Sequence, residues 1–77
     1  MNIKKGKHMK NKILTKREQQ IFELLVLNKT TKDIAKELHI SEKTVRNHIS
    51  NTMQKLGVQG RCSAIIELLK LEAITLN

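Results

Sequence analysis

The chain has 77 residues and is strongly basic, with 15 lysines and arginines against seven acidic residues and a net charge of +8. A chain of this length forms one small domain that buries only about 60% of its unfolded surface. Its apolar runs are far shorter than the ~20 residues of a membrane-spanning helix, and its basic start lacks a secretory signal's apolar stretch. The single cysteine, Cys62, excludes an internal disulfide, and no zinc-binding spacing is present. We therefore expect a cytoplasmic protein with no metal, no other cofactor and no membrane partner.

Residues 1–12 contain five lysines and no acidic residue, which leaves ten basic against seven acidic residues, or +3, for the rest. This segment lacks helical periodicity, so we expect a flexible basic tail ahead of a folded domain over residues 13–77. The tail either lies along the phosphate backbone of a nucleic acid or only keeps the chain soluble. The second interpretation is the simpler one. The sequence is compatible with a natural start at either Met1 or Met9.

The first predicted helix runs from about Lys16 to Asn28. Thr15 and Glu18, three residues apart, form a capping box at its start. Ile21, Phe22 and Leu25 give it a core face. Phe22 is the one aromatic residue of the chain, which argues against binding single-stranded nucleic acid or RNA by base stacking.

Residues 30–56 predict two helices joined by a short turn. Thr30 caps the first helix, which covers Thr31 to Leu38 and contains Ala35, small enough for a close helix crossing. His39-Ile40-Ser41 then forms the connection, with His39 where this kind of turn usually has glycine. Two helices joined by three or four residues are typical of a helix-turn-helix.

The second of these helices begins after the N-cap Ser41 and ends at Leu56, before Gly57. Its inward face carries Val45, Ile49, Met53 and Leu56. Its opposite face carries Lys43, Thr44, Asn47, Ser50, Asn51 and Gln54, with Arg46 on the flank. The only acidic residue is Glu42 in the first turn. Because an α-helix fits the major groove and its N-terminal residues reach base edges, we predict base contacts from Arg46, Asn47 and Ser50. The alternative is an ordinary polar surface helix, which this composition alone leaves open.

The last predicted helix, about Arg61 to Ala73, has two apolar stripes. One contains Ala64, Ile65, Leu68 and Leu71, and the other contains Ile66, Leu69 and Ala73, with Cys62 near its start. A helix that is apolar on two sides must be covered twice. We expect one stripe to close the domain and the other to contact the same helix of a second chain; the alternative is that both are covered within one chain.

No catalytic constellation can be assembled from this sequence. The three histidines are scattered, and the acidic residues lie near lysines or arginines at helical spacing. Neither a nucleophile with its base nor a glycine-rich phosphate loop is present. We therefore expect no enzymatic activity, and His48 is predicted to bond either a phosphate or the scaffold.

Three segments carry a family resemblance: LTKRE at 14–18, TTKDIAKELHISEKTVRNHISN at 30–51 and QKLGVQGR at 54–61. They resemble the LuxR/FixJ/GerE class of bacterial transcription regulators. The resemblance implies an all-α, four-helix, helix-turn-helix DNA-binding domain that dimerises through its last helix. It also implies base contacts from Arg46, Asn47 and Ser50. The residues expected at the DNA backbone are Thr30, Thr31, Lys43, Thr44, His48 and Lys55. Gly60 departs from the Asn or Asp that caps the last helix in many members.

We therefore expect a homodimeric, sequence-specific regulator that binds double-stranded DNA and consists only of its DNA-binding domain. Within the class, the chain resembles a small free-standing regulator of late sporulation genes, and this resemblance implies that role and RNA polymerase as a partner. The competing hypothesis is a helical adaptor of the transcription machinery that uses its basic face on an acidic protein.

Overall fold

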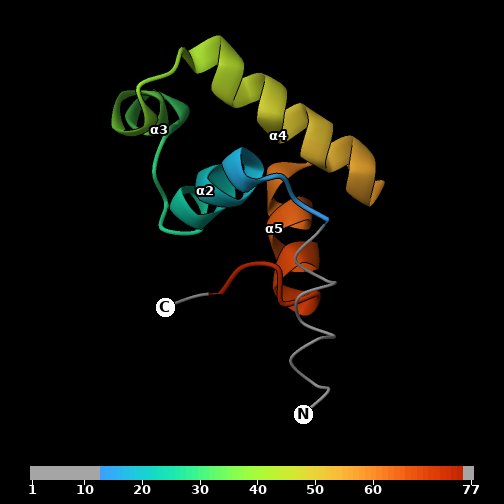
Figure 1. Ribbon diagram of the computed structural model, residues 1–77. Helices are drawn as coiled ribbons and strands as arrows, with labels where there is room; N and C mark the ends of the chain where they lie inside the picture. The colour runs from blue at the N-terminus through green and yellow to red at the C-terminus, as the bar shows by residue number, and fades with distance from the viewer. Residues whose placement is uncertain (1–12, 76–77) are drawn as a thin grey trace.

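The computed structural model describes residues 13–75, so the expected basic tail lies outside the described residues. Four helices and no strand make up the described part: α2 (Lys16–Leu25), α3 (Thr31–Leu38), α4 (Glu42–Leu56) and α5 (Arg61–Lys70). In Figure 1, α4 is the longest helix and passes across α2 and α5, with α3 beside its N-terminal end. The all-α helix-turn-helix expected from the sequence is confirmed.

Side-chain caps fix three of the four helix starts. The Thr15 hydroxyl accepts from the Glu18 amide at 3.1 Å, and the Glu18 carboxylate accepts from the Thr15 amide at 3.0 Å. Thr30 forms the same reciprocal box with Asp33, and the Ser41 hydroxyl accepts from the Thr44 amide. These contacts satisfy amide groups that the first helical turn leaves free. The fourth helix, α5, follows Gly60 and has no side-chain cap.

A left-handed residue follows each of the four helices: Asn28, His39, Gly57 and Glu72. In every case the next amide donates to the carbonyl oxygen five residues earlier, at 2.9 to 3.2 Å. This is the Schellman pattern, which satisfies the last carbonyls of a helix and reverses the chain. Only one of the four positions is glycine, the residue that adopts a positive φ without steric cost.

These turns shorten two helices relative to the predictions. The first was expected to reach Asn28 but ends at Leu25, and the last was expected to reach Ala73 but ends at Lys70. Both predictions were wrong because Asn28 and Glu72 adopt left-handed conformations that helical periodicity does not reveal.

The core lies where α4 packs against each of the other three helices. Its fully buried large side chains are Ile21, Phe22, Ile34, Val45, Ile49, Thr52 and Leu68. Thr52 was not predicted, although it lies seven residues after Val45 on the same helix face. Its hydroxyl donates to the His48 carbonyl at 2.9 Å, so a polar atom is buried there without losing its partner.

Candidate nucleic-acid interface

The exposed face of α4 carries the predicted base-contacting residues. Arg46, Asn47 and Ser50 are all exposed, which leaves their donors and acceptors accessible to a ligand. The other exposed residues of the helix are Lys43, Asn51, Gln54 and Lys55. None of these seven side chains is acidic, so the face has a positive charge and neutral hydrogen-bonding groups.

Glu42 joins α3 to this face of α4. Its Oε2 accepts a 3.0 Å hydrogen bond from the Thr31 hydroxyl and lies 3.4 Å from the guanidinium of Arg46. Thr31 is the first residue of α3, and Glu42 is the first residue of α4. The carboxylate therefore connects the two helices of the helix-turn-helix and also contacts one of the predicted base-contacting side chains.

The residues predicted at the DNA backbone differ in what they contact. Thr30 is exposed and caps α3, while Thr31 is half-buried and bonded to Glu42. The Thr44 hydroxyl lies 2.9 Å from the Ser41 hydroxyl, in the first turn of α4. His48 is half-buried, and Lys43 is exposed. Thr30, Thr31, Lys43 and Thr44 thus all lie within the first turn of α3 or α4 or at its cap.

Lys55 has two partners inside the chain, which the sequence did not predict. Its Nζ donates to Oε1 of Glu18 at 2.5 Å and to the Ile13 carbonyl at 2.9 Å. Glu18 is only 3% exposed. Burial acts to raise the pKa of this carboxyl, but the hydrogen bonds from Lys55 and the Thr15 amide, with the positive charges of Lys55 and His48, lower it overall. Glu18 therefore stays ionised inside the domain.

The second apolar stripe of α5 is only partly as predicted. Ile66 is 54% exposed, Cys62 is exposed and Leu69 is half-buried. Ala73 lies beyond α5 and is 2% exposed, so its predicted place on an intermolecular stripe was wrong. The left-handed Glu72 turns the chain back, and the Ala73 amide bonds the Leu68 carbonyl at 2.9 Å. The Ala73 carbonyl in turn accepts from the side-chain Nε2 of Gln19 at 2.7 Å, which holds the C-terminal segment on α2.

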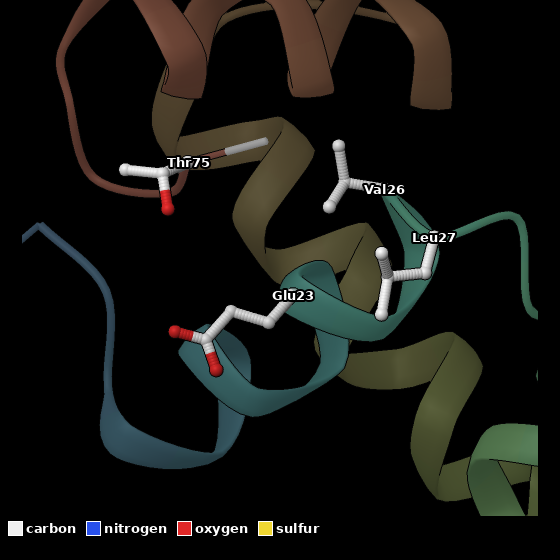
Figure 2. A pocket seen from close by; sticks show the side chains of 4 residues that line it. All are labelled: Glu23, Val26, Leu27 and Thr75. Atoms are coloured by element: carbon white, nitrogen blue, oxygen red, sulfur yellow. The ribbon is translucent and has the colours of Figure 1, made fainter. Parts of the chain in front are cut away.

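A shallow hollow of about 200 Å³ lies between the end of α2 and the C-terminal segment. Figure 2 shows Glu23, Val26 and Leu27 on one side and Thr75 on the other, and no residue of α4 lines it. Its volume is below the roughly 300 to 1,000 Å³ of small-molecule sites.

Within residues 13–75, no three His, Cys, Asp or Glu side chains are grouped to hold a metal ion. None of the described helices has the length and apolar character to cross a membrane.

Comparison with known proteins agrees with this geometry. Residues 12–68 match the family described as bacterial regulatory proteins, luxR family. The chain is 60% identical over 74 residues to the spore germination protein GerE of Bacillus subtilis strain 168, covering 96% of this chain and 100% of that protein. It is 43% identical over 58 residues to the transcriptional regulatory protein DegU of Brevibacillus brevis, where the match spans only 25% of that longer protein.

The fold comparison gives the same result. The solved structure of the transcription factor GerE superposes with a TM-score of 0.83 at 63% identity, covering 84% of this chain and 97% of that one. The match includes the helix-turn-helix with its exposed, acid-free helix face, and the resemblance expected from the sequence is confirmed. The chain is a DNA-binding transcription regulator rather than an enzyme, and it belongs to the LuxR family of bacterial regulatory proteins.

Proposed function

We propose that the chain binds one double-stranded DNA sequence as a homodimer, with α4 of each protomer in a major groove. The observation that carries this proposal is the exposed face of α4, whose seven exposed side chains include no carboxylate. Arg46 suits guanine and Asn47 suits adenine, because each can form two hydrogen bonds with the edge of that base. Ser50, one turn further along, contacts the next part of the site.

Phosphate contacts position this helix in the groove. Thr30 and Thr31 stand at the N-terminus of α3, and Lys43 and Thr44 are in the first turn of α4. The positive dipole end of each helix, together with the first-turn amides that its cap does not satisfy, favours a phosphate. His48, half-buried on the flank of α4, is the fifth of these contacts. Lys55, the sixth residue expected at the DNA backbone, is instead bonded to Glu18 and to the Ile13 carbonyl. Such contacts fix the register of the protein on DNA but do not distinguish one base from another.

The dimer forms through α5. Ile66 is a large apolar side chain that is 54% exposed, and Leu69 and Cys62 are on the same stripe. Recognition of two half-sites one turn of DNA apart requires the twofold pairing of α5 to hold the two α4 helices about 34 Å apart. The chain is similar over nearly its whole length to a spore germination protein, which supports a role in controlling late sporulation genes. The protein acts in the cytoplasm. RNA polymerase is the partner through which such control acts.

A duplex competition experiment tests this function. The preferred sequence is first selected from a random duplex library, and its affinity is then compared with that of random DNA. A sequence-specific regulator prefers its site by about three orders of magnitude or more. A helical adaptor that binds an acidic protein shows no such preference, so a flat selection would overturn the proposal.

The variant Asn47→Ala then identifies the base-contacting face. We expect it to weaken binding to the selected site by roughly 1 to 3 kcal/mol and to leave binding to random DNA nearly unchanged. Gln59→Ala is the matched control, since it removes the same amide group from an exposed position between α4 and α5. Equal losses on both DNAs would assign Asn47 to the phosphate backbone instead.

A further inference from the structure

Three segments meet at the C-terminal end of α4. Lys55, in the last turn of this helix, bonds Glu18 in the first turn of α2 and the carbonyl of Ile13, which precedes α2. Figure 1 shows the blue start of the described chain beside the orange end of α4, in agreement with these contacts. Glu18 also accepts from the Thr15 amide at 3.0 Å. A single buried carboxylate is thus bonded to both the cap of α2 and the end of α4.

This pair differs from an ordinary surface ion pair. The Glu18 side chain is 4% exposed, and the Lys55 side chain is 39% exposed. A carboxylate at this depth must be paired, because an isolated buried charge is strongly unfavourable. Two of the three donors of the Lys55 ammonium are used inside the chain. Lys55 is therefore held in place before any DNA arrives, unlike a mobile lysine that follows a phosphate.

We propose that Glu18 and Lys55 are positioning residues for DNA recognition, whose ion pair holds α4 at the angle at which its exposed face meets the bases. This inference rests on the proposed function. The other end of α4 is held by the bond between Thr31 and Glu42. Polar contacts at both ends of this 15-residue helix add directional constraints to the apolar packing between them, which is itself non-directional. Recognition requires such control, since functional groups must be held to about 0.5 Å and 10 to 20°.

The positioning role and a phosphate contact predict opposite results. A lysine that neutralises one phosphate contributes roughly 0.9 to the slope of log affinity against log salt, and its loss weakens binding to every sequence. A positioning lysine leaves the slope unchanged, and its loss weakens binding to the selected site far more than to random DNA. Neutralising Glu18 separates the two roles a second time, because it releases Lys55 from its charged partner. A released Lys55 that contacts a phosphate binds both DNAs more tightly, whereas a positioning Lys55 loses its orientation, so the preference for the selected site falls.

The experiment measures affinity for the selected and random duplexes across a salt series for Lys55→Met, Glu18→Gln and the double variant. Circular dichroism at low temperature establishes that each variant is folded under the conditions used. We expect each single variant to lose about tenfold in preference for the selected site, the size of one lost base contact, with an unchanged slope. The double variant should be no worse than either single variant, because both substitutions remove the same ion pair. Lys43→Met is the comparison for a phosphate contact and should lower the slope by about 0.9.

The outcomes separate the two proposals. A wild-type chain that selects no sequence overturns the proposed function itself. If the wild type selects a site but Lys55→Met weakens both DNAs equally and lowers the slope, Lys55 is a phosphate contact and the positioning role is wrong. If Lys55→Met fails to fold, Glu18→Gln decides between the two roles. A lost preference of Glu18→Gln for the selected site supports the positioning role. Tighter binding of Glu18→Gln to both DNAs, with a steeper salt slope, overturns the positioning role.

Discussion

The hydroxyl of Thr31 donates a 3.0 Å hydrogen bond to the Glu42 carboxylate, joining the first residue of α3 to the first residue of α4. The same carboxylate oxygen lies 3.4 Å from Arg46. Both members of the latter pair are substantially exposed, and such pairs contribute only about 0.3 to 0.5 kcal/mol. In the DNA complex proposed above, a guanine therefore replaces Glu42 as the partner of Arg46 at little cost, while Thr31 keeps the carboxylate in place.

The first prediction concerns the charge of Glu42. Glu42→Gln keeps an acceptor for Thr31 but removes the only acidic residue of α4. We expect tighter binding to both the selected and random duplexes, by up to about 1 kcal/mol, because one repulsion with the phosphates is lost. Fluorescence anisotropy titrations measure both affinities.

Glu23→Gln is the control, because it removes a carboxylate at the hollow that α4 does not line. Weaker binding by Glu42→Gln would show that its pairing with Arg46 matters more than its repulsion of DNA.

The second prediction concerns the left-handed His39, at φ 59° and ψ 44°. This conformation is costly for a residue with a Cβ and free of that cost for glycine. We expect His39→Gly to raise the free energy of unfolding by about 0.5 kcal/mol after the greater unfolded-state freedom of glycine is subtracted. For a domain of this size that is a rise of roughly 2 to 4 °C in Tm.

Gly57→Ala provides the opposite case for thermal unfolding. Gly57 has φ 71°, and a Cβ built there would meet no atom within 4 Å, so any loss comes from the backbone conformation alone. A loss of about 1 kcal/mol is expected. If His39→Gly lowered stability instead, contacts of the imidazole would outweigh the strain of its backbone.

The third prediction follows from the lowered pKa of Glu18. Its burial favours the neutral acid, but Lys55, the Thr15 amide and the charge of His48 together favour the carboxylate. Because the folded pKa lies below the unfolded value near 4.5, the ionised group stabilises the fold fully above that value. This stabilisation is lost as the pH falls through the folded pKa.

Urea unfolding from pH 7 to pH 3 measures this contribution. Wild-type stability should fall in the acid range, and Glu18→Gln should be less stable at pH 7 but lose less on acidification. Glu23→Gln removes an exposed carboxylate of the same helix and should retain the wild-type pH dependence. Parallel pH curves for wild type and Glu18→Gln would contradict the role of this carboxyl.

Local signals predicted the helix starts and the exposed face of α4. Capping boxes at Thr15 and Thr30 and the N-cap at Ser41 involve residues three positions apart, so they are visible in sequence. The period of α4 likewise predicted which side carries Arg46 and Asn47. These features depend on neighbours along the chain rather than on the fold.

Other features depend on contacts that a linear pattern does not contain. Glu18 and Lys55 are 37 residues apart, and each is consistent with a solvated surface position until the helices are packed. Ala73 has the spacing of an α5 residue, but a left-handed turn at Glu72 places it in the core. Glutamate is not a typical residue for that conformation, so nothing in the sequence indicated the turn.

The last prediction tests the dimer, on which recognition of two half-sites depends. Two large apolar side chains of the described chain are strongly exposed, Ile66 at 54% and Leu27 at 55%. Ile66→Glu should leave the monomer folded, because its side chain is already exposed there. In a twofold contact through α5, this substitution would bring two carboxylates into an apolar seam, which costs several kcal/mol.

The Ile66→Glu variant should sediment as a monomer, keep its helical circular dichroism and lose affinity for a two-half-site operator far more than for one half-site. Leu27→Glu makes the same change at the other exposed position, just after α2, and should remain dimeric. Dissociation by Leu27→Glu and not by Ile66→Glu would move the interface to the end of α2.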